Sequence, residues 1–518
     1  MNSQMKWGVG GMRRALLLAS AAIALGAFAP SAMADNKVVF GIVTDIHTTD
    51  PDRVSSGGDW NVLANIFEAL MGRDAQGRLA PELATDVKVS EDGLTYEFTL
   101  REGVKFHNGD PFTAEDVVFS WQRARDPELK FTYVEWVANK IANAEVIDPM
   151  HVRMTLKAKN PTFLKDLKPF LPIVPKNYIE KVGNDGFAAA PVGTGPFKYV
   201  SRQVQSSIEL ETNKDYWGKP AGVDSVSMRI VPDENTRMAM LMAGEADVIA
   251  NVHPLLVPQM ESNPELKPLI VPALQEHFLM LNPQSPIFEP KVREAINLAI
   301  DRAGLTQGLF LSTATPMGTW CLENRELGCT DMPSYAYDVA KAKELIDASG
   351  YDKSRPVRIY GLAPGGRPQT KEIVEAVASY LGALGLKSEI TLMEFGTYLA
   401  FKGAKEKDYS KHDLIFYTWA TWTDDPVSQR LSPILSSKGT SSFYRIPELD
   451  EKLAAIDTVP MDQRAARIRD AMIYVHEQNL VVPLMSPSVI YGMRANVEWT
   501  PPADLITPLI GTLSRPAN

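Results

Sequence analysis

Cysteine is nearly absent from this sequence of 518 residues, which contains only two cysteines and seven histidines. No two histidines have the spacing of a metal-ligand pair, so we expect neither a metal site nor any other cofactor. The sequence also lacks the G-x-S-x-G, S-x-x-K, H-E-x-x-H and Walker motifs, and no glycine fingerprint follows a predicted strand. These absences argue against the common classes of hydrolase and nucleotide-binding enzyme.

An excess of basic residues is missing as well. The sequence has 63 acidic against 53 basic residues, and its formal net charge is −10. This balance argues against a polyanionic partner such as nucleic acid. After the first 34 residues there is no apolar stretch long enough to span a membrane, and no short repeat occurs. We therefore expect a soluble globular protein of several domains.

The N-terminal segment has the features of an export signal. A basic stretch that ends in Arg13 and Arg14 precedes an apolar run at residues 15–28, and Ala-Met-Ala follows at residues 32–34. The run is shorter than the roughly 20 residues that a membrane anchor needs, and the small-x-small pattern suits signal peptidase. The sequence predicts cleavage after Ala34 and a periplasmic location, without a lipid anchor because no cysteine lies near the cleavage site.

The two cysteines, Cys321 and Cys329, close a short polar loop. In an oxidising compartment this arrangement favours a structural disulfide. A redox pair or a metal site are the alternatives, but the spacing is not C-x-x-C and no histidine accompanies the pair.

Strand-like and helix-like periodicity alternate along the rest of the chain, which is typical of a layered α/β architecture. Predicted strands lie at residues 37–42, 96–100, 226–230, 247–250, 278–281, 357–360, 390–393 and 413–417. Predicted helices lie at residues 59–71, after a cap at Thr113, between Asp233 and Gly244, from 290 to 300, and at 338–348, 370–384 and 461–477. Extended segments after residue 480 would return to the first strand and make the N-terminal lobe discontinuous.

Several longer blocks resemble one known family. Residues 79–84 and residues 89–120 closely resemble the signature of the family 5 extracellular solute-binding proteins, which are the periplasmic dipeptide-, oligopeptide- or nickel-binding components of ABC transporters. Residues 192–197, 213–217 and 290–301 are similar to further family blocks in the same order. The resemblance covers essentially the whole chain after the signal.

The resemblance implies a periplasmic binding protein-like fold of class II, with two hinged α/β lobes and an extra lobe. After a signal peptide at residues 1–34, lobe I would comprise residues 35–66, 190–270 and 483–518, the extra lobe II residues 67–189, and lobe III residues 271–482. A ligand would be enclosed between the lobes by closure of the hinge. The loaded protein would then dock on ABC transporter permease subunits in the inner membrane.

Ligand contacts are expected from the loops after the first predicted strand and from a segment in the C-terminal half. The candidate ligand-binding residues are Asp45, His47, Ser56, Gly57, Trp419, Thr421, Trp422, Asp424 and Asp425.

The C-terminal part of this candidate site departs from the peptide-binding members. Those members resemble a pattern W-x-x-D-x-x-x-P, whose carboxylate pairs with the α-ammonium group of the ligand. An ungapped match of Trp419 and Pro426 puts Trp422 where the aspartate should be. Either Asp424 or Asp425 takes over the ammonium group or the ligand lacks it, because a buried ammonium without a counter-charge is unfavourable. Trp422 would face a cation or a sugar ring, or pack in the core.

Three classes of function follow. The first is a binding protein that captures peptides or peptide-like solutes for an ABC importer. The second has the same role for a non-peptide solute such as an opine, a sugar or a nickel chelate. The third is an exported enzyme, which the missing catalytic motifs disfavour. We expect a monomer that is not an enzyme, with a small-molecule ligand and a permease as its partners.

Overall fold

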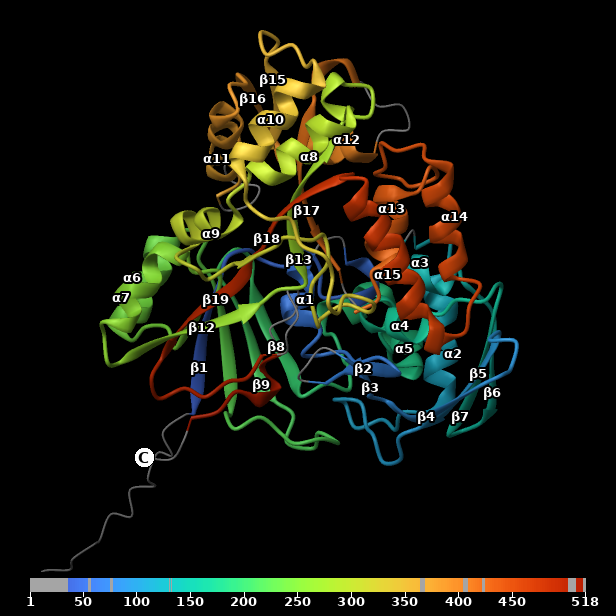
Figure 1. The fold of residues 1–518 in the computed structure, drawn as a ribbon. Coiled ribbons are helices and arrows are strands. Elements are labelled where there is room, and N and C mark those ends of the chain that lie inside the picture. Colours follow the sequence, from blue (N-terminus) through green and yellow to red (C-terminus); the bar gives the residue numbers. More distant parts are fainter. Residues whose placement is uncertain are drawn as a thin grey trace, which may run out of the picture. The chain divides into compact units, whose positions relative to one another are not determined.

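Strands and helices alternate along the chain, as the periodicity predicts (Figure 1). The computed structural model describes residues 36–54, 57–74, 78–129, 131, 133–363, 369–403, 409–421, 424–501 and 509–515. The predicted signal peptide lies outside these ranges. Within them, every helix is too short or too polar to cross a membrane. The described residues form sheets of seven, six, four and two strands.

The seven-stranded sheet gathers strands from distant parts of the chain. In spatial order they are β12 (Leu266–Pro272), β19 (Ser488–Arg494), β11 (Val248–Ile249), β1 (Lys37–Ile42), β10 (Ser225–Ile230), β9 (Ser207–Thr212) and β8 (Phe197–Gln203). Its helices are α1 (Gly57–Leu63), α6 (Glu234–Ala243) and α7 (Val257–Glu261). The first strand, β1, pairs in parallel with both β10 and β11, so it is central. The loop after β1 therefore leaves the carboxyl edge of the sheet, where α/β folds bind ligands.

The six-stranded sheet is built from the C-terminal half. Its order is β14 (Thr315–Pro316), β18 (Val481–Ser486), β13 (Gln275–Leu281), β17 (Leu414–Ala420), β15 (Val357–Leu362) and β16 (Ser388–Met393). The helices of this half are α8 (Pro290–Ala299), α9 (Arg302–Phe310), α10 (Val339–Ser349), α11 (Thr370–Ala383), α12 (Phe395–Gly403), α13 (Ser432–Leu435), α14 (Pro447–Ile456) and α15 (Met461–Glu477). Because β17 lies inside the sheet, the segment that follows it also starts at a central position.

The four-stranded sheet has a hydrophobic core of its own. Its order is β4 (Ala84–Val89), β5 (Thr95–Leu100), β7 (His151–Leu156) and β6 (Ile141–Asp148). A two-stranded sheet of β2 (Met71–Arg73) and β3 (Leu79–Pro81) precedes it, and the helices of this region are α2 (Ala114–Ala124), α3 (Tyr133–Ala138), α4 (Phe163–Phe170) and α5 (Lys176–Ala189). Figure 1 shows this region at the lower right, with α2 beside β6 and β7.

Two short connections join the seven-stranded and six-stranded sheets. Residues 273–274 separate β12 from β13, and Pro487 alone separates β18 from β19. The two connections touch, since the amide N of Ala273 donates to the carbonyl O of Pro487 over 3.3 Å. The two sheets are thus joined by two short crossovers that lie side by side.

The helix predicted at residues 59–71 is wrong in length. Helix α1 ends at Leu63, and Met71 already begins strand β2. The reason lies in the backbone between them. The carbonyl groups of Asn65 and Ile66 accept hydrogen bonds from the amides of Phe197 and Gly195, at 3.0 and 2.9 Å, instead of from a next helical turn.

The glycine-rich turn at residues 192–197 packs directly on this backbone. A Cβ atom on Gly193 would overlap the carbonyl oxygen of Ile66. We therefore expect Gly193→Ala to lower the free energy of unfolding by about 1–3 kcal/mol, as overpacking does. The control is Gly308→Ala in α9, where an added Cβ meets no atom within 4 Å, and which should be neutral or slightly stabilising. Urea denaturation measures both; equal stability of the two variants would contradict the packing argument.

Candidate functional site

The loop after β1 is held by a buried ion pair. The guanidinium of Arg202 donates to Asp45, with Nη2 2.8 Å from Oδ2, and the amide of Gln205 donates to the same oxygen over 2.8 Å. Burial alone would raise the pKa of Asp45, but the hydrogen bonds from Arg202 and Gln205 lower it below its usual value. Asp45 thus stays ionised and fixes the start of the loop.

His47 lies two residues further along the same loop and is exposed. Its backbone amide donates to Oδ1 of Asp59 over 2.6 Å, and its Nδ1 lies 3.2 Å from the same oxygen. The Asp59 side chain is fully buried in α1, whereas the His47 side chain is 66% exposed. The imidazole is therefore oriented by a rigid acceptor while it remains accessible to a ligand. Gly57 begins α1, and Ser56 lies outside the described residues.

The segment after β17 begins with Trp419, which is half-buried. Its indole Nε1 donates to the carbonyl O of Gln429 over 2.7 Å, and the Nζ atom of Lys402 lies 4.3 Å from its ring centroid. Thr421 is buried, and its amide donates over 2.9 Å to the carbonyl O of Leu274, which lies between β12 and β13. Trp422, on which the sequence prediction of the ligand class depends, lies outside the described residues.

The two neighbouring carboxylates of this segment have different surroundings. Asp425 is fully buried and accepts from Nε of Arg464 in α15 over 2.6 Å. The Asp424 side chain is 36% exposed and lies 2.6 Å from Nζ of Lys165 in α4. The chain bends at Asp424, just before the helical turn Val427–Leu431, and the two side chains have separate partners. Asp425 is thus part of the internal structure, whereas Asp424 faces out of it.

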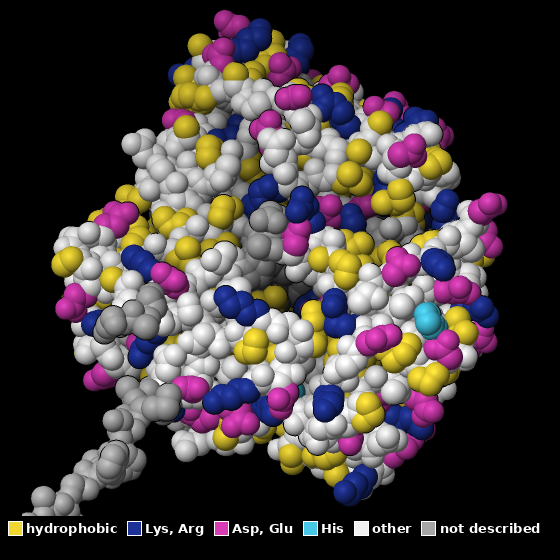
Figure 2. Space-filling model, turned by 90° about the horizontal axis from the view of Figure 1, so that it is seen from below, with side chains coloured by type: hydrophobic (Ala, Val, Ile, Leu, Met, Phe, Trp, Pro, Cys, Tyr) yellow, Lys and Arg dark blue, Asp and Glu magenta, His cyan; other side chains and the backbone are white. Residues whose placement is uncertain are grey.

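The candidate residues form two groups in the structure. Among the described residues, no hydrogen bond or ion pair joins the loop after β1 to the segment after β17. Each group follows the carboxyl end of a central strand in its own sheet. Seen from below, the surface is hollowed near its centre, with Lys and Arg side chains beside the hollow (Figure 2).

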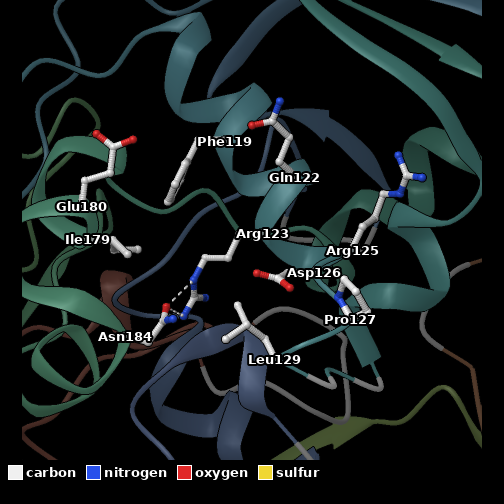
Figure 3. Close-up of a pocket in the computed structure, with 10 residues that line it drawn as sticks. All are labelled: Phe119, Gln122, Arg123, Arg125, Asp126, Pro127, Leu129, Ile179, Glu180 and Asn184. Carbon is white, nitrogen blue, oxygen red and sulfur yellow. Dashed lines mark hydrogen bonds between the residues drawn. The ribbon is translucent and has the colours of Figure 1, made fainter.

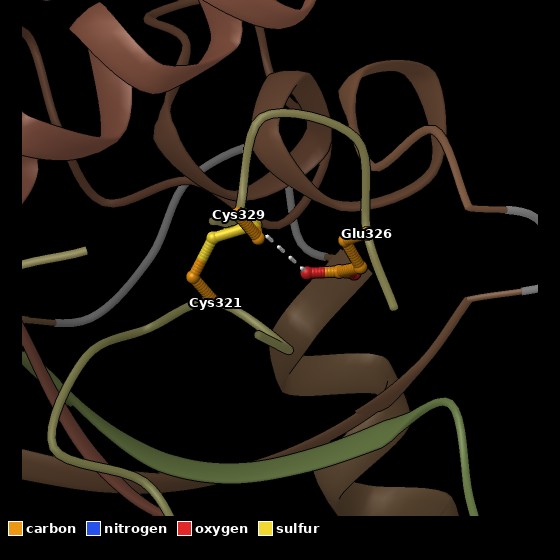
Figure 4. Close-up of side chains that lie close together, drawn as sticks. All are labelled: Cys321, Glu326 and Cys329. Carbon is orange, nitrogen blue, oxygen red and sulfur yellow. Dashed lines mark hydrogen bonds between the residues drawn. A yellow bond between two sulfur atoms is a disulfide. The ribbon is translucent and has the colours of Figure 1, made fainter. Parts of the chain in front are cut away.

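A disulfide joins Cys321 and Cys329, with their Cα atoms 5.7 Å apart, and the Glu326 carboxylate lies beside it (Figure 4). The loop that it closes contacts both the crossover between β12 and β13 and the candidate site. Arg325 donates to the carbonyl groups of Ala273 and Pro272 over 2.7 and 3.0 Å, and the amide of Leu327 donates to Asp424 O over 2.7 Å. The disulfide loop therefore connects the crossover between β12 and β13 to the segment after β17.

Sulfur atoms that are bonded to each other carry no thiolate charge. Cys321, Glu326 and Cys329 lie within metal-ligand distance of one another, but in this state the two sulfur atoms are not available as anionic ligands. The disulfide is therefore a structural crosslink that closes this loop.

A buried charge triad lies next to the loop. Arg430, in a π-helical turn at Val427–Leu431, forms ion pairs with Glu276 and with Glu326, the latter over 2.7 Å. All three side chains are almost completely buried. Burial raises the pKa of Glu326 to about 8, and the nearby carboxylates of Asp425 and Asp424 add to the rise. One guanidinium thus faces two carboxyl groups, and the raised pKa keeps a proton on Glu326 at neutral pH.

This raised pKa predicts a pH-dependent stability. The folded state holds a proton on Glu326 that the unfolded chain, with an ordinary Glu pKa of 4.5, has released. The contribution is complete below pH 4.5 and is lost as the pH rises through about 8, with a slope of up to about 1.4 kcal/mol per pH unit.

Glu326→Gln should make the free energy of unfolding less dependent on pH between pH 5 and 8, because glutamine cannot ionise while Glu276 still neutralises Arg430. Denaturant unfolding at several pH values measures the difference between the variant and the parent. Other buried acids with raised pKa values, Glu68 and Asp52, are present in both proteins and cancel. Parallel pH profiles would contradict the assignment.

A cavity of about 550 Å³ lies between α2 and α5 (Figure 3). It is lined by Phe119, Gln122, Arg123, Arg125, Asp126, Pro127, Leu129, Ile179, Glu180 and Asn184. Arg123 in its wall pairs with the buried side chains of Asp50 and Asp52, which belong to the loop after β1. None of the candidate ligand residues lines the cavity. Its wall supports the loop after β1 through the ion pairs of Arg123.

Sequence reasoning missed three basic residues near the candidate site: Lys165, Arg325 and Lys402. Lys402 is buried in α12, with its Nζ 4.7 Å from the Tyr417 ring centroid and 4.3 Å from that of Trp419. The partners of Lys165 and Arg325 are more than 50 residues away in the sequence. No local motif marks such contacts, so only the fold could reveal them.

Comparison with known proteins gives a consistent result. The sequence model of a family described as bacterial extracellular solute-binding proteins, family 5, middle part, matches residues 78–442. A glutathione-binding protein, GsiB from Salmonella typhi, is 29% identical over 496 residues, which cover 93% of this chain and 94% of the relative. These relatives are binding proteins.

Solved structures agree with this. DppA from Helicobacter pylori, a periplasmic binding protein associated with an ABC transporter and solved with the peptide STSA, is 26% identical with a TM-score of 0.73, covering 93% of this chain and 98% of that chain. HbpA2 from Haemophilus parasuis is 24% identical with a TM-score of 0.81, covering 93% and 100%. The fold is therefore the mixed α/β fold of the large periplasmic binding proteins.

Proposed function

The chain belongs to the bacterial extracellular solute-binding proteins of family 5, which makes it a solute-binding component of an ABC importer, and we propose that its solute is a peptide or a peptide-like compound. The relatives named for glutathione and the one solved with a peptide support this ligand class. The solute would be enclosed between the loop after β1 and the segment after β17 and then delivered to permease subunits of the inner membrane.

We further propose the lobe division that the sequence suggests, with its borders at residues 270/271 and 482/483 moved to the ends of β12 and β18. Lobe I would contain the seven-stranded sheet, the extra lobe II the four-stranded sheet, and lobe III the six-stranded sheet. The two adjacent connections at residues 273–274 and at Pro487 are then the hinge. Closure about them would bring the two groups of candidate residues toward each other around the solute.

The observation that supports a peptide is the surroundings of Asp424. Its carboxylate is partly exposed and already binds a primary ammonium group, the Nζ of Lys165, at 2.6 Å. Asp425 is buried against Arg464, so Asp424 is the carboxylate that we assign to the α-ammonium of the peptide. A charge-assisted contact of this kind compensates the desolvation of the ligand's ammonium group.

The remaining candidate residues divide by their surroundings. His47 and Trp419 keep accessible surface and would contact the solute, together with Thr421, Ser56, Gly57 and Trp422. The Thr421 hydroxyl is buried without a hydrogen-bond partner among the described residues, so a polar ligand atom would satisfy it. Asp45 and Asp425 would act through the backbone that they position.

A non-peptide solute is the second candidate. It rests on Trp422, which stands where the peptide-binding pattern has its aspartate. An opine, a sugar or a nickel chelate has no α-ammonium group of the peptide kind and would leave Asp424 with Lys165. Trp422 would then stack on the solute or face its cationic part.

Isothermal titration calorimetry on protein that has been unfolded and refolded to remove carried-over solute separates these candidates. The panel is trialanine, Met-Leu and S-methylglutathione, which has no thiol to attack the disulfide, against an opine, a sugar and nickel-histidine. Peptide binding with a Kd in the micromolar range or below supports the proposal. Binding of only one of the other solutes would establish the second candidate.

Two further parts of the proposal have direct tests. Protein released from the periplasm by osmotic shock should have the intact mass of a chain that starts at Asp35, as cleavage after Ala34 requires. A mass that includes residues 1–34 would contradict the signal assignment. The bound peptide should be recovered unchanged after prolonged incubation, and its hydrolysis would revive the exported enzyme.

A further inference from the structure

One ion pair connects helix α4 to the candidate ligand segment. The Nζ atom of Lys165 lies 2.6 Å from Oδ1 of Asp424, and the two side chains are 15% and 36% exposed. Among the described residues, this is the one ion pair that joins residues 67–189 to residues 271–482. The contact therefore crosses from the proposed extra lobe to lobe III, beside the place where we put the ligand.

Both ends of this contact are fixed by their own lobes. In α4, Phe163 and Leu167 flank Lys165 and are fully buried in the core of the four-stranded sheet. At the other end, the carbonyl O of Asp424 accepts from the amide of Leu327 over 2.7 Å, in the loop that the disulfide closes. The two backbones are thus anchored, and the entropic cost of the contact is mainly that of ordering the Lys165 side chain.

The chemistry of Lys165 matches that of a peptide's first group. A lysine side chain ends in a primary ammonium, as does the amino terminus of a peptide, and a carboxylate oxygen accepts either one. Lys165 occupies Oδ1 of Asp424, and a second ammonium group on the same carboxylate would lie within a few ångströms of the first and be repelled by it. An incoming peptide ammonium therefore binds Asp424 most strongly when Lys165 has moved away.

We propose that Lys165 is an internal competitor for the α-ammonium group of the ligand at Asp424. This inference rests on the proposed function, in which Asp424 anchors that group. The exchange leaves the number of ion pairs at Asp424 unchanged. The loss of the Lys165 contact therefore offsets part of the favourable binding free energy of the ligand's ammonium group. Solutes that offer only a weak contact to Asp424 are thereby excluded, and Lys165 becomes a determinant of specificity.

Lys165→Met tests the proposal, because methionine keeps an apolar stem of similar length and removes the ammonium. Calorimetry with trialanine should give a Kd that is roughly three- to fivefold lower than in the parent protein. Nα-acetyl-trialanine, which has no ammonium group, should gain nothing. In an Asp424→Asn background the substitution should have no effect on either probe.

The matched control is Lys176→Met, which removes a lysine of the same region that pairs with Glu115 over 3.0 Å, and which should leave the Kd unchanged. Thermal unfolding of each variant, with Lys165→Gln as a second substitution, excludes a folding defect. The Kd of Lys165→Met for trialanine could be unchanged or higher while Asp424→Asn still abolishes the preference for trialanine over Nα-acetyl-trialanine. That result overturns the role of Lys165 as a competitor but leaves Asp424 as the anchor. If trialanine does not bind, or if Asp424→Asn leaves its Kd unchanged, the proposed anchor fails as well.

Discussion

Asp424→Asn is expected to weaken the binding of trialanine by about 2 kcal/mol, which is roughly 30-fold in Kd. The substitution keeps the shape of the side chain and one acceptor oxygen but removes the charge and replaces the other oxygen by an amide donor. The α-ammonium of the peptide would then be desolvated without a counter-charge. The value is at the lower end for a paired charge, because the Asp424 side chain is 36% exposed in this structure.

The neighbouring substitution, Asp425→Asn, is the control, and its expected effect is of a different kind. Asp425 is buried against Arg464, so the loss of its charge should lower the unfolding temperature rather than the affinity of the folded protein. The pair of variants separates binding from stability at adjacent positions. If Asp425→Asn weakened peptide binding at unchanged stability while Asp424→Asn did not, the anchor would be assigned to the wrong residue.

The sequence predicted those elements whose signals are local. The helix at residues 461–477 coincides with α15, because its periodicity continues without interruption. Helix α6 lies between its predicted ends: Asp233 caps the first turn, and Gly244 ends the helix in a left-handed conformation with φ of 75°. In both helices the residues that set the limits lie within the helix or next to it.

Prediction failed where contacts with distant segments of the chain determine the local structure. Residues 65–70 have helical periodicity, but their carbonyl groups accept hydrogen bonds from the backbone of residues 195–197, of residue 173 and of residues 82–84. The same limit applies to the candidate site. The sequence offered Asp424 and Asp425 as equivalent, and only their partners Lys165 and Arg464, far along the chain, distinguish them.

The largest loss of stability is expected from Arg430→Met. Arg430 is fully buried and is the cation that Glu276 and Glu326 share. Its removal leaves the buried Glu276 carboxyl group without a cation beside it, while Glu326, with its pKa raised to about 8, still mostly holds a proton at pH 7.5. Breaking a buried pair from one side costs about 3–5 kcal/mol, and we expect a loss of that size in urea denaturation at pH 7.5. Arg445→Met, at an exposed position, should change the free energy of unfolding by less than about 0.5 kcal/mol.

The pH dependence of this loss distinguishes charge from packing. At pH 5, the two carboxyl groups in Arg430→Met can take up protons and become neutral, so the variant should recover a large part of its stability relative to pH 7.5. Glu276→Gln combined with Glu326→Gln in the same background should give a similar recovery at pH 7.5. A loss that stays the same at both pH values and in the triple variant would mean that Arg430 stabilises the fold by filling space, since a cavity does not titrate.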